Sequence, residues 1–135
     1  LRFCIDYRKL NALTIRDAFP LRRKDDTLDS LQEATVFSTL DLRTAYWQVE
    51  MNEKSREKTA FITHRGLFEF KMMPYGLTNA PATFQRLMDT VLVGLKWQCC
   101  LVYLDDVIIY SPSFDQHLKD LTKVFEALRT ANLKL

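Results

Sequence analysis

The order of the sequence patterns predicts an α+β fold in which helices cover one face of an antiparallel sheet. Three apolar runs typical of strands, at 36–40, 99–104 and 107–110, supply the expected sheet. Two segments that begin after residues 79 and 113 carry apolar residues at helical spacing. With 135 residues, 47% of them hydrophobic, the chain is long enough for one domain with a buried core.

The chain before Asp41 is expected to form two strands and one short helix. Residues 3–7 are a short apolar run typical of a strand, and a polar connection follows as far as Pro20. Residues 26–31 combine capping residues with helical spacing. Residues 36–40 are rich in strand-forming side chains, so this strand would place Asp41 at its end.

A hairpin and two longer helices are expected after that strand. Residues 59–63 and 67–73 are typical of strands and flank the turn signal Arg65-Gly66. Pro81 suits the first turn of the next helix, whose apolar stripe is Phe84, Leu87, Met88, Val91, Leu92 and Leu95. The last helix begins at Ser113, with Gln116 completing a capping box, and its expected buried face is Leu118, Leu121, Phe125 and Leu128.

Composition narrows the class of protein. The three cysteines lack metal-ligand spacing, which favours reduced, buried thiols in an intracellular protein. No apolar run is long enough to cross a bilayer, and the N-terminus is unlike a signal peptide. Because the chain begins at Leu1 and its last residues supply no closing element, we expect it to be a piece of a longer polypeptide.

Basic residues gather in two segments. Residues 1–24 contain seven basic and two acidic side chains, and residues 54–71 contain five and two. Such segments around an acidic site would suit a polyanion held over bound metal ions. The alternative is an ordinary solvated surface.

Asp105 and Asp106 stand between two apolar runs, where neighbouring carboxylates repel each other and lose hydration. One interpretation is a hairpin turn open to water, although the glycine or asparagine that favours such turns is missing. The other is neutralisation by cations. Asp41 also ends a strand-like run, and carboxylates that converge from neighbouring strands can bind Mg²⁺. A pair of such ions would promote in-line phosphoryl displacement.

Four motifs resemble those of reverse transcriptases, in that family's order, and together they cover almost the whole chain. Residues 103–106, followed by 107–111, resemble the central motif, and 37–42 with Ala45-Tyr46 resemble the first carboxylate motif. Residues 73–85 resemble the intervening motif, and 2–11 are similar to the fingers segment. The amino-acid sequence of residues 77–85 is similar to the corresponding segment in Pol polyproteins of gypsy-type LTR retrotransposons.

The resemblance implies a site and a reaction. Asp41, Asp105 and Asp106 would be the catalytic metal ligands, joined by the backbone of Leu42, and would hold two Mg²⁺ ions, for which Mn²⁺ could substitute. The implied activity is RNA-directed DNA polymerisation, in which nucleotidyl transfer extends a primer 3′-hydroxyl. The implied partners are an RNA or DNA template with its primer, deoxynucleoside triphosphates and the rest of the Pol polyprotein, with no membrane.

The resemblance also implies how the nucleotide is held. Arg2 would contact the triphosphate, since a guanidinium can bond phosphate oxygens in pairs, and Tyr46 would exclude a ribose 2′-hydroxyl. Further nucleotide contacts are implied for Thr44, Ala45, Tyr75, Gly76 and Leu104, and primer or template contacts for Arg8, Pro81 and Tyr103. From the residues alone, Tyr46 could equally be core and Arg2 a surface charge. Tyr75 and residues 22–24 depart from the family's pattern.

The implied architecture is the palm of a right-hand polymerase, at 17–48 and 80–135, with part of the fingers at 1–16 and 49–79. Thumb, connection and RNase H regions would be absent, so the isolated chain is expected to be inactive. The expected location is intracellular, in a cytoplasmic virus-like particle, with nuclear entry as a further step. The rival functions are a non-catalytic remnant or domesticated nucleic-acid-binding module, and an RNA-dependent RNA polymerase palm, which Tyr46 disfavours.

Overall fold

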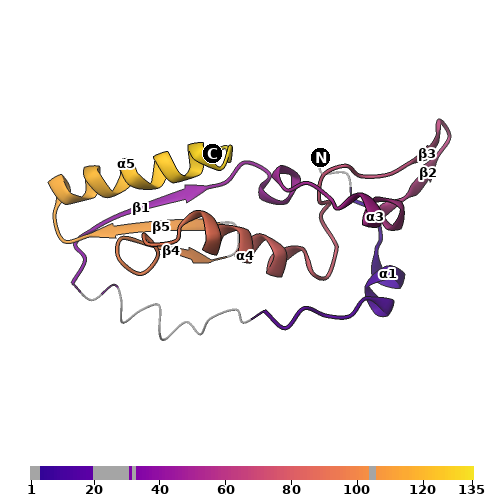
Figure 1. Cartoon of the computed structure of the whole chain (residues 1–135), viewed down its shortest axis with the longest axis horizontal. Helices are drawn as coiled ribbons and strands as arrows, with labels where there is room; N and C mark the ends of the chain where they lie inside the picture. The colour runs from indigo at the N-terminus through magenta and orange to yellow at the C-terminus, as the bar shows by residue number, and fades with distance from the viewer. Residues whose placement is uncertain (1–3, 20–30, 32, 104–105) are drawn as a thin grey trace. The chain divides into compact units, whose positions relative to one another are not determined.

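The computed structural model describes residues 4–19, 31, 33–103 and 106–135. The chain divides into two compact units, one of Leu1–Ala18 with Thr44–Phe84 and the other of Phe19–Arg43 with Gln85–Leu135. Figure 1 labels the helices and strands.

A three-stranded sheet forms the centre of the second unit, in the order β1-β5-β4. Its strands are β1 (Val36–Asp41), β4 (Cys100–Tyr103) and β5 (Asp106–Ser111), and both pairings are antiparallel. The structure therefore confirms the strands predicted at 36–40, 99–104 and 107–110 over their described residues, except that Cys99 lies in the turn before β4. Val107 and Ile109 of the central strand are fully buried and anchor the core of this unit.

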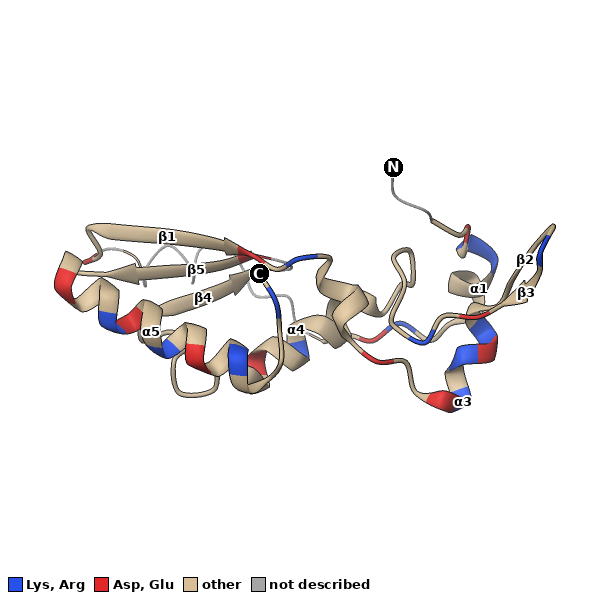
Figure 2. Ribbon diagram, turned by 90° about the horizontal axis from the view of Figure 1, so that it is seen from above, with Lys and Arg blue, Asp and Glu red and all other residues tan. Residues whose placement is uncertain are grey.

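Helix α5 (Phe114–Thr130) packs on β5 and β1, as Figure 1 shows. It begins as predicted, because the Ser113 hydroxyl accepts a hydrogen bond from the Gln116 N–H at 3.4 Å. The Gln116 side chain does not complete the capping box, since it donates to Asp120 Oδ1 instead, at 2.9 Å. Acidic and basic residues are interspersed along α5 in Figure 2.

The predicted buried face of α5 was wrong in part. Leu118 and Phe125 are 49% and 40% exposed, and only Leu128 of the expected set is fully buried. The buried residues are His117, Asp120, Val124 and Leu128. Because neighbouring helix positions differ by about 100°, the helix is turned by roughly one residue from the face that hydrophobicity predicts. Polar partners around His117 and Asp120 explain why this polar face is buried.

Helix α4 (Ala80–Val91) confirms the second helix prediction. Pro81 lies in its first turn, where a missing N–H breaks no helical hydrogen bond. Phe84 and Met88 are almost completely buried, as the predicted stripe requires, and so is Leu92, which lies just beyond the end of the helix. Leu87, Val91 and Leu95 are half-buried at the edges of that stripe.

The first unit consists of short elements. They are α1 (Arg8–Leu13), η1 (Ala45–Gln48), α3 (Glu53–Arg56), η2 (Glu57–Thr59), β2 (Phe61–Thr63) and β3 (Gly66–Phe68). The hairpin is confirmed by the antiparallel pairing of β2 with β3. Its first strand begins at Phe61 rather than at residue 59, and its second ends at Phe68 rather than at residue 73. Gly66 lies within β3, at a φ of 130°, so the turn residues are His64 and Arg65.

The N-terminal predictions were partly wrong. Cys4–Tyr7 form no strand, and α1 occupies part of the expected polar connection. Tyr7 precedes α1 at its N-cap position, without a side-chain capping bond. Its side chain is buried instead, and its hydroxyl donates to Thr59 O at 3.0 Å. The helix predicted at 26–31 and residues 22–24 lie outside the described residues, apart from Leu31. Among described helices, none combines the length and apolarity needed to span a membrane.

We predict that a single thiol of the folded chain reacts with iodoacetamide at pH 8. Cys4 is exposed, whereas Cys99 and Cys100 are buried. Burial raises the pKa of the Cys99 thiol and raises that of Cys100 to about 12, so neither supplies the reactive thiolate. Mass spectrometry should show one label on the native chain and three after denaturation in urea. Rapid native labelling of Cys100 would contradict the packing of β4.

Candidate functional site

The candidate site is the end of the β1–β5 pair, where Asp41 lies directly opposite Asp106. Asp41 is the last residue of β1 and Asp106 is the first of β5, so the antiparallel pairing brings together carboxylates 65 positions apart in the sequence. Both side chains are exposed. Of the three predicted metal ligands, the structure thus juxtaposes these two.

This pairing is electrostatically unfavourable in the protein alone. Directly opposed residues of an antiparallel pair have Cα atoms about 4.5–5.5 Å apart, and like charges at such positions destabilise a sheet. Within the described part of the chain, neither carboxylate has a hydrogen bond or an ion pair that would neutralise it. Exposed carboxylate oxygens facing each other are the donors that hard divalent cations such as Mg²⁺ prefer. The pair therefore fits a metal ion chemically.

The remaining residues of this end of the sheet are only partly described. Tyr103 lies opposite Asp106 on the other side of β5 and is 50% exposed, whereas Leu104 and Asp105 lie outside the described residues. Among described residues, no group of three potential metal ligands gathers, which is expected when the third predicted carboxylate is Asp105. The Leu42 side chain is buried, and the metal-binding role of its backbone stays a prediction.

An aromatic cluster surrounds Tyr46 in the first unit. The Tyr46 ring lies 5.2 Å from that of Tyr75 and 5.7 Å from that of Phe84, centroid to centroid. The Trp47 ring also packs near that of Tyr75, with 6.0 Å between the ring centroids. Such contacts fix the orientation of a ring. Tyr75, which departs from the family's pattern, therefore supports Tyr46 by packing against it.

The turn that carries Tyr46 has an unusual backbone. Thr44, the residue before η1, has a φ of 48°, a left-handed conformation that is uncommon for threonine. Ala45 is almost completely buried, so the turn is packed into the unit rather than lying loose on its surface. The nucleotide contacts predicted for the backbone of Thr44 and Ala45 stay predictions.

Asn11 fixes the loop that contains Gly76, and sequence reasoning gave this asparagine no role. Its Nδ2 donates to Gly76 O at 2.7 Å, and its Oδ1 accepts from the Thr78 N–H at 2.9 Å. Gly76 has a φ of 95°, which disfavours any side chain there. Its Cα also approaches Tyr7, whose ring would lie 3.5 Å from an added Cβ.

Asn79 makes a second clamp of the same kind. Its Oδ1 accepts from the Asp17 N–H at 3.0 Å, and its Nδ2 donates to Ile15 O at 2.9 Å. Both asparagines line a cavity of about 720 Å³ in the first unit. The signal in the sequence was an asparagine in each of two loop-like motifs, since this side chain can satisfy backbone N–H and C=O groups together.

Arg8 is held by an acidic neighbour. Its guanidinium pairs with the Asp6 carboxylate at 2.6 Å, and these hydrogen bonds lower the pKa of Asp6 to about 2. The pair is exposed, so the guanidinium remains at the surface. Arg2 lies outside the described residues, and Pro81 is half-buried in α4. The primer, template and triphosphate contacts predicted for these residues stay predictions.

An antiparallel sheet backed by a helix, with carboxylates paired at one strand end, is the arrangement expected of a nucleic acid polymerase palm. A sequence profile of the family described as reverse transcriptase (RNA-dependent DNA polymerase) matches residues 1–135. The chain belongs to the reverse transcriptase family.

Curated relatives agree with this assignment. The chain is 50% identical over 134 residues to the retrovirus-related Pol polyprotein from transposon 297 of Drosophila melanogaster, covering 99% of this chain and 13% of that protein. It is 48% identical over 130 residues to an RNA-directed DNA polymerase homolog of Oenothera berteroana, with 94% and 92% covered. Identity to the Pol polyprotein from transposon gypsy of Drosophila melanogaster is 41%, with 99% and 13% covered. The chain thus spans a small part of these polyproteins.

Solved structures show the same fold. A foamy viral protease-reverse transcriptase in complex with double-stranded DNA matches with a TM-score of 0.87 and 27% identity, over 98% of this chain and 23% of that one. The same viral enzyme in complex with an RNA/DNA hybrid matches with a TM-score of 0.76 and 27% identity, over 91% and 16%. The α+β fold of a reverse transcriptase palm is therefore confirmed.

We predict that Asp106→Asn stabilises the chain when no divalent ion is present. The substitution removes one of two directly opposed charges, which should raise the free energy of unfolding by roughly 0.2–1 kcal/mol. Urea unfolding in EDTA should show this gain, and it should shrink in 1 M salt because salt screens exposed charges. Thr39→Val, an exposed change on the partner strand β1, is the control for changed side-chain shape. A loss of stability in EDTA would contradict the repulsive pairing with Asp41.

Proposed function

We propose that this chain is the palm, with part of the fingers, of a Pol polyprotein of an LTR retroelement, and that the polyprotein catalyses RNA- and DNA-templated DNA synthesis. The observation that carries the proposal is the direct pairing of Asp41 with Asp106 at the end of β1 and β5. Family membership and the identity to transposon Pol polyproteins support the substrate class.

Asp41 and Asp106 would hold divalent ions, together with Asp105, in the proposed site. Reverse transcriptases as a family use Mg²⁺, which when bound activates a hydroxyl nucleophile and neutralises phosphate charge. The carboxylates of Asp41 and Asp106 would hold the positive charge of these ions at the point where the ends of β1 and β5 meet. The reaction joins the primer 3′-oxygen to the α-phosphorus of a deoxynucleoside triphosphate, while the bond to pyrophosphate breaks and the hydroxyl proton is lost.

Tyr46 would select the sugar. A ring held by Tyr75 and Phe84 cannot move aside easily, so it would exclude a 2′-hydroxyl by steric overlap. This arrangement supports a deoxynucleotide polymerase over an RNA-dependent RNA polymerase.

Template and primer would be bound partly by charge. The basic segments at 1–24 and 54–71 are suited to nucleic acid backbones. The foamy viral relatives were solved with double-stranded DNA and with an RNA/DNA hybrid, which supports the same two classes of duplex here. The finer boundaries, with fingers at 1–16 and 49–79 and palm at 17–48 and 80–135, belong to this proposal, as does a cytoplasmic virus-like particle with later nuclear entry.

We predict that Asp41→Asn and Asp106→Asn each abolish primer extension by the polyprotein with Mg²⁺. A neutral amide is a poorer ligand for a hard cation than a carboxylate, so the loss should exceed about 100-fold. Extension of a primed RNA template, with template binding measured by fluorescence anisotropy, separates chemistry from binding. Asp115→Asn, a change on the exposed start of α5, is the matched control. Full activity of either site variant would exclude the proposed site.

We predict that Tyr46→Val admits ribonucleotides. Removing the ring opens the space that a 2′-hydroxyl needs, so the preference for deoxynucleotides should fall by at least tenfold, about 1.4 kcal/mol. Single-nucleotide incorporation kinetics with paired ribo- and deoxynucleotides would measure this ratio. Trp47→Val, which leaves the Tyr46 ring in place, is the control. Unchanged sugar selection in Tyr46→Val would remove the gate assignment.

A further inference from the structure

The β1 strand is weakly held by apolar packing, although it carries Asp41. Its side chains alternate between half-buried and exposed, and none is fully buried. Within the described sheet it is an edge strand, paired only with β5. Because register is specified strongly only where one face of a strand is buried, hydrophobic packing does little to prevent β1 from slipping along β5. A slip would separate Asp41 from Asp106.

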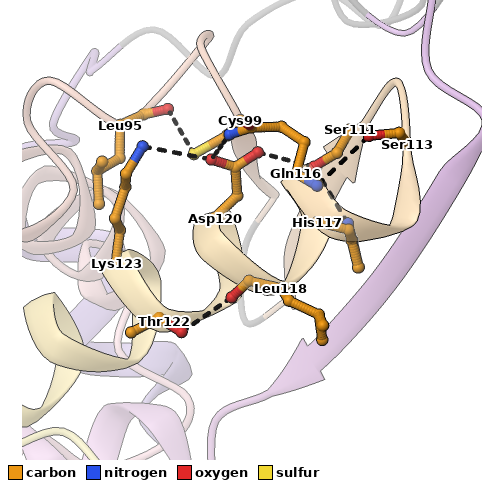
Figure 3. A network of polar contacts seen from close by, with 10 residues as sticks. All are labelled: Leu95, Cys99, Ser111, Ser113, Gln116, His117, Leu118, Asp120, Thr122 and Lys123. Atoms are coloured by element: carbon orange, nitrogen blue, oxygen red, sulfur yellow. Dashed lines mark hydrogen bonds and ion pairs between the residues drawn. The ribbon is translucent and has the colours of Figure 1, made fainter.

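A chain of buried polar groups joins β1 to β5 and α5, as Figure 3 shows for the α5 side. Ser38 Oγ lies 2.8 Å from His117 Nε2, and His117 Nδ1 lies 3.2 Å from Ser111 Oγ. Ser111 Oγ donates to Asp120 Oδ2 at 2.8 Å. His117, Ser111 and Asp120 are each at most 4% exposed. We call these four residues, Ser38, His117, Ser111 and Asp120, the β1 relay.

The hydrogen-bond directions in the β1 relay follow from its acidic end. Asp120 Oδ1 faces two donors, Gln116 Nε2 at 2.9 Å and Lys123 Nζ at 3.4 Å, as an ionised carboxylate requires. Ser111 has one hydroxyl hydrogen and gives it to Asp120, so its oxygen must accept from His117 Nδ1–H. In the neutral form of the ring, the lone pair is then at Nε2. Ser38 must therefore donate its hydroxyl hydrogen to that nitrogen.

The β1 relay fixes the strand at a specific position along β5. Ser38 lies opposite Ile109, three residues before Asp41, and bonds a histidine that α5 holds in one tautomer. At the start of the strand, the Thr35 N–H and hydroxyl bond Ser111 O and Pro112 O at 3.1 and 2.9 Å. A slip of β1 along β5 would break these bonds and leave Nε2 of the buried His117 without its partner, which is costly.

We propose that Ser38 and His117 are positioning residues that keep Asp41 opposite Asp106, and so set the affinity of this strand end for Mg²⁺. The inference rests on the proposed function for the role of the metal ion, but not for the relay itself. Ser38 acts through the register of β1, because strand alternation places its side chain on the face opposite to that of Asp41.

The first experiment tests the relay without metal. Nitrogen-15 NMR of the 135-residue chain at pH 8 reports which ring nitrogen of His117 carries hydrogen. The β1 relay requires the Nδ1–H tautomer, whereas free histidine favours Nε2–H. His64, which is exposed, provides the internal reference. Detection of an Nε2–H tautomer at His117 would overturn the relay.

The second experiment uses two variants of matched shape. Ser38→Thr keeps the hydroxyl and Ser38→Val lacks it, and both residues favour strands, so both chains should fold. Mg²⁺ titration followed by the amide shifts of Asp41 and Asp106 should give near-unchanged affinity for Ser38→Thr. For Ser38→Val it should be roughly tenfold weaker, the scale on which outer-shell partners tune metal sites. Thr39→Val makes the same change outside the relay and should bind as the unmodified chain does.

The outcomes separate this inference from the proposed function. If Asp41→Asn leaves Mg²⁺ binding unchanged, the metal site itself is wrong. If Asp41→Asn abolishes binding but Ser38→Val binds normally, the metal site stands and the positioning role is overturned. Equal weakening in Ser38→Thr and Ser38→Val would show that shape rather than the hydroxyl matters, which would also overturn it.

Discussion

The candidate site depends on one pairing, that of β1 with β5 in a register that sets Asp41 opposite Asp106. This contact costs stability in the protein alone, because like charges face each other at the end of a sheet. Proteins commonly accept such a cost where function requires it. Around this pair the second unit is well packed, with Val107 and Ile109 buried in the central strand and Val124 and Leu128 buried on the inner face of α5. The packing of this core thus offsets the repulsion between the two carboxylates at the strand end.

Buried polar residues are part of that packing. His117 and Asp120 lie on the inner face of α5, where apolar side chains were expected, and each has hydrogen-bond partners. Burial of such groups is tolerable when they are satisfied and expensive when they are not. A polar connection of this kind favours one register over its neighbours, and β1 has no fully buried face whose hydrophobic pattern would specify that register strongly. This connection explains how an edge strand with no fully buried residue can hold a functional carboxylate.

The first unit also holds its predicted binding residues in place, but through a different set of contacts. Its elements are short, so loops rather than long helices carry Tyr46, Tyr75 and Gly76. Asn11 supplies hydrogen bonds to the backbone of Gly76 and Thr78, and Asn79 supplies them to the backbone of Ile15 and Asp17. The contacts of Tyr75 and Phe84 with Tyr46 fix its ring. Rigid loops of this type are where binding residues commonly lie. The aromatic cluster therefore gives the proposed sugar gate its stiffness.

The sequence by itself determined the three central strands, helix α4, the start of α5 and the carboxylates at strand ends, because these depend on local periodicity, capping and motif wording. It also identified the family through four ordered motifs, as the comparisons confirmed. Only the tertiary structure decided the direct opposition of Asp41 and Asp106, the inner face of α5 and the clamps of Asn11 and Asn79. Each of these depends on partners distant in the sequence: His117 is buried because Ser38 and Ser111 satisfy it. Hydrophobic pattern alone cannot reveal such partners, so it predicted Leu118 on the buried face and did not include His117 there.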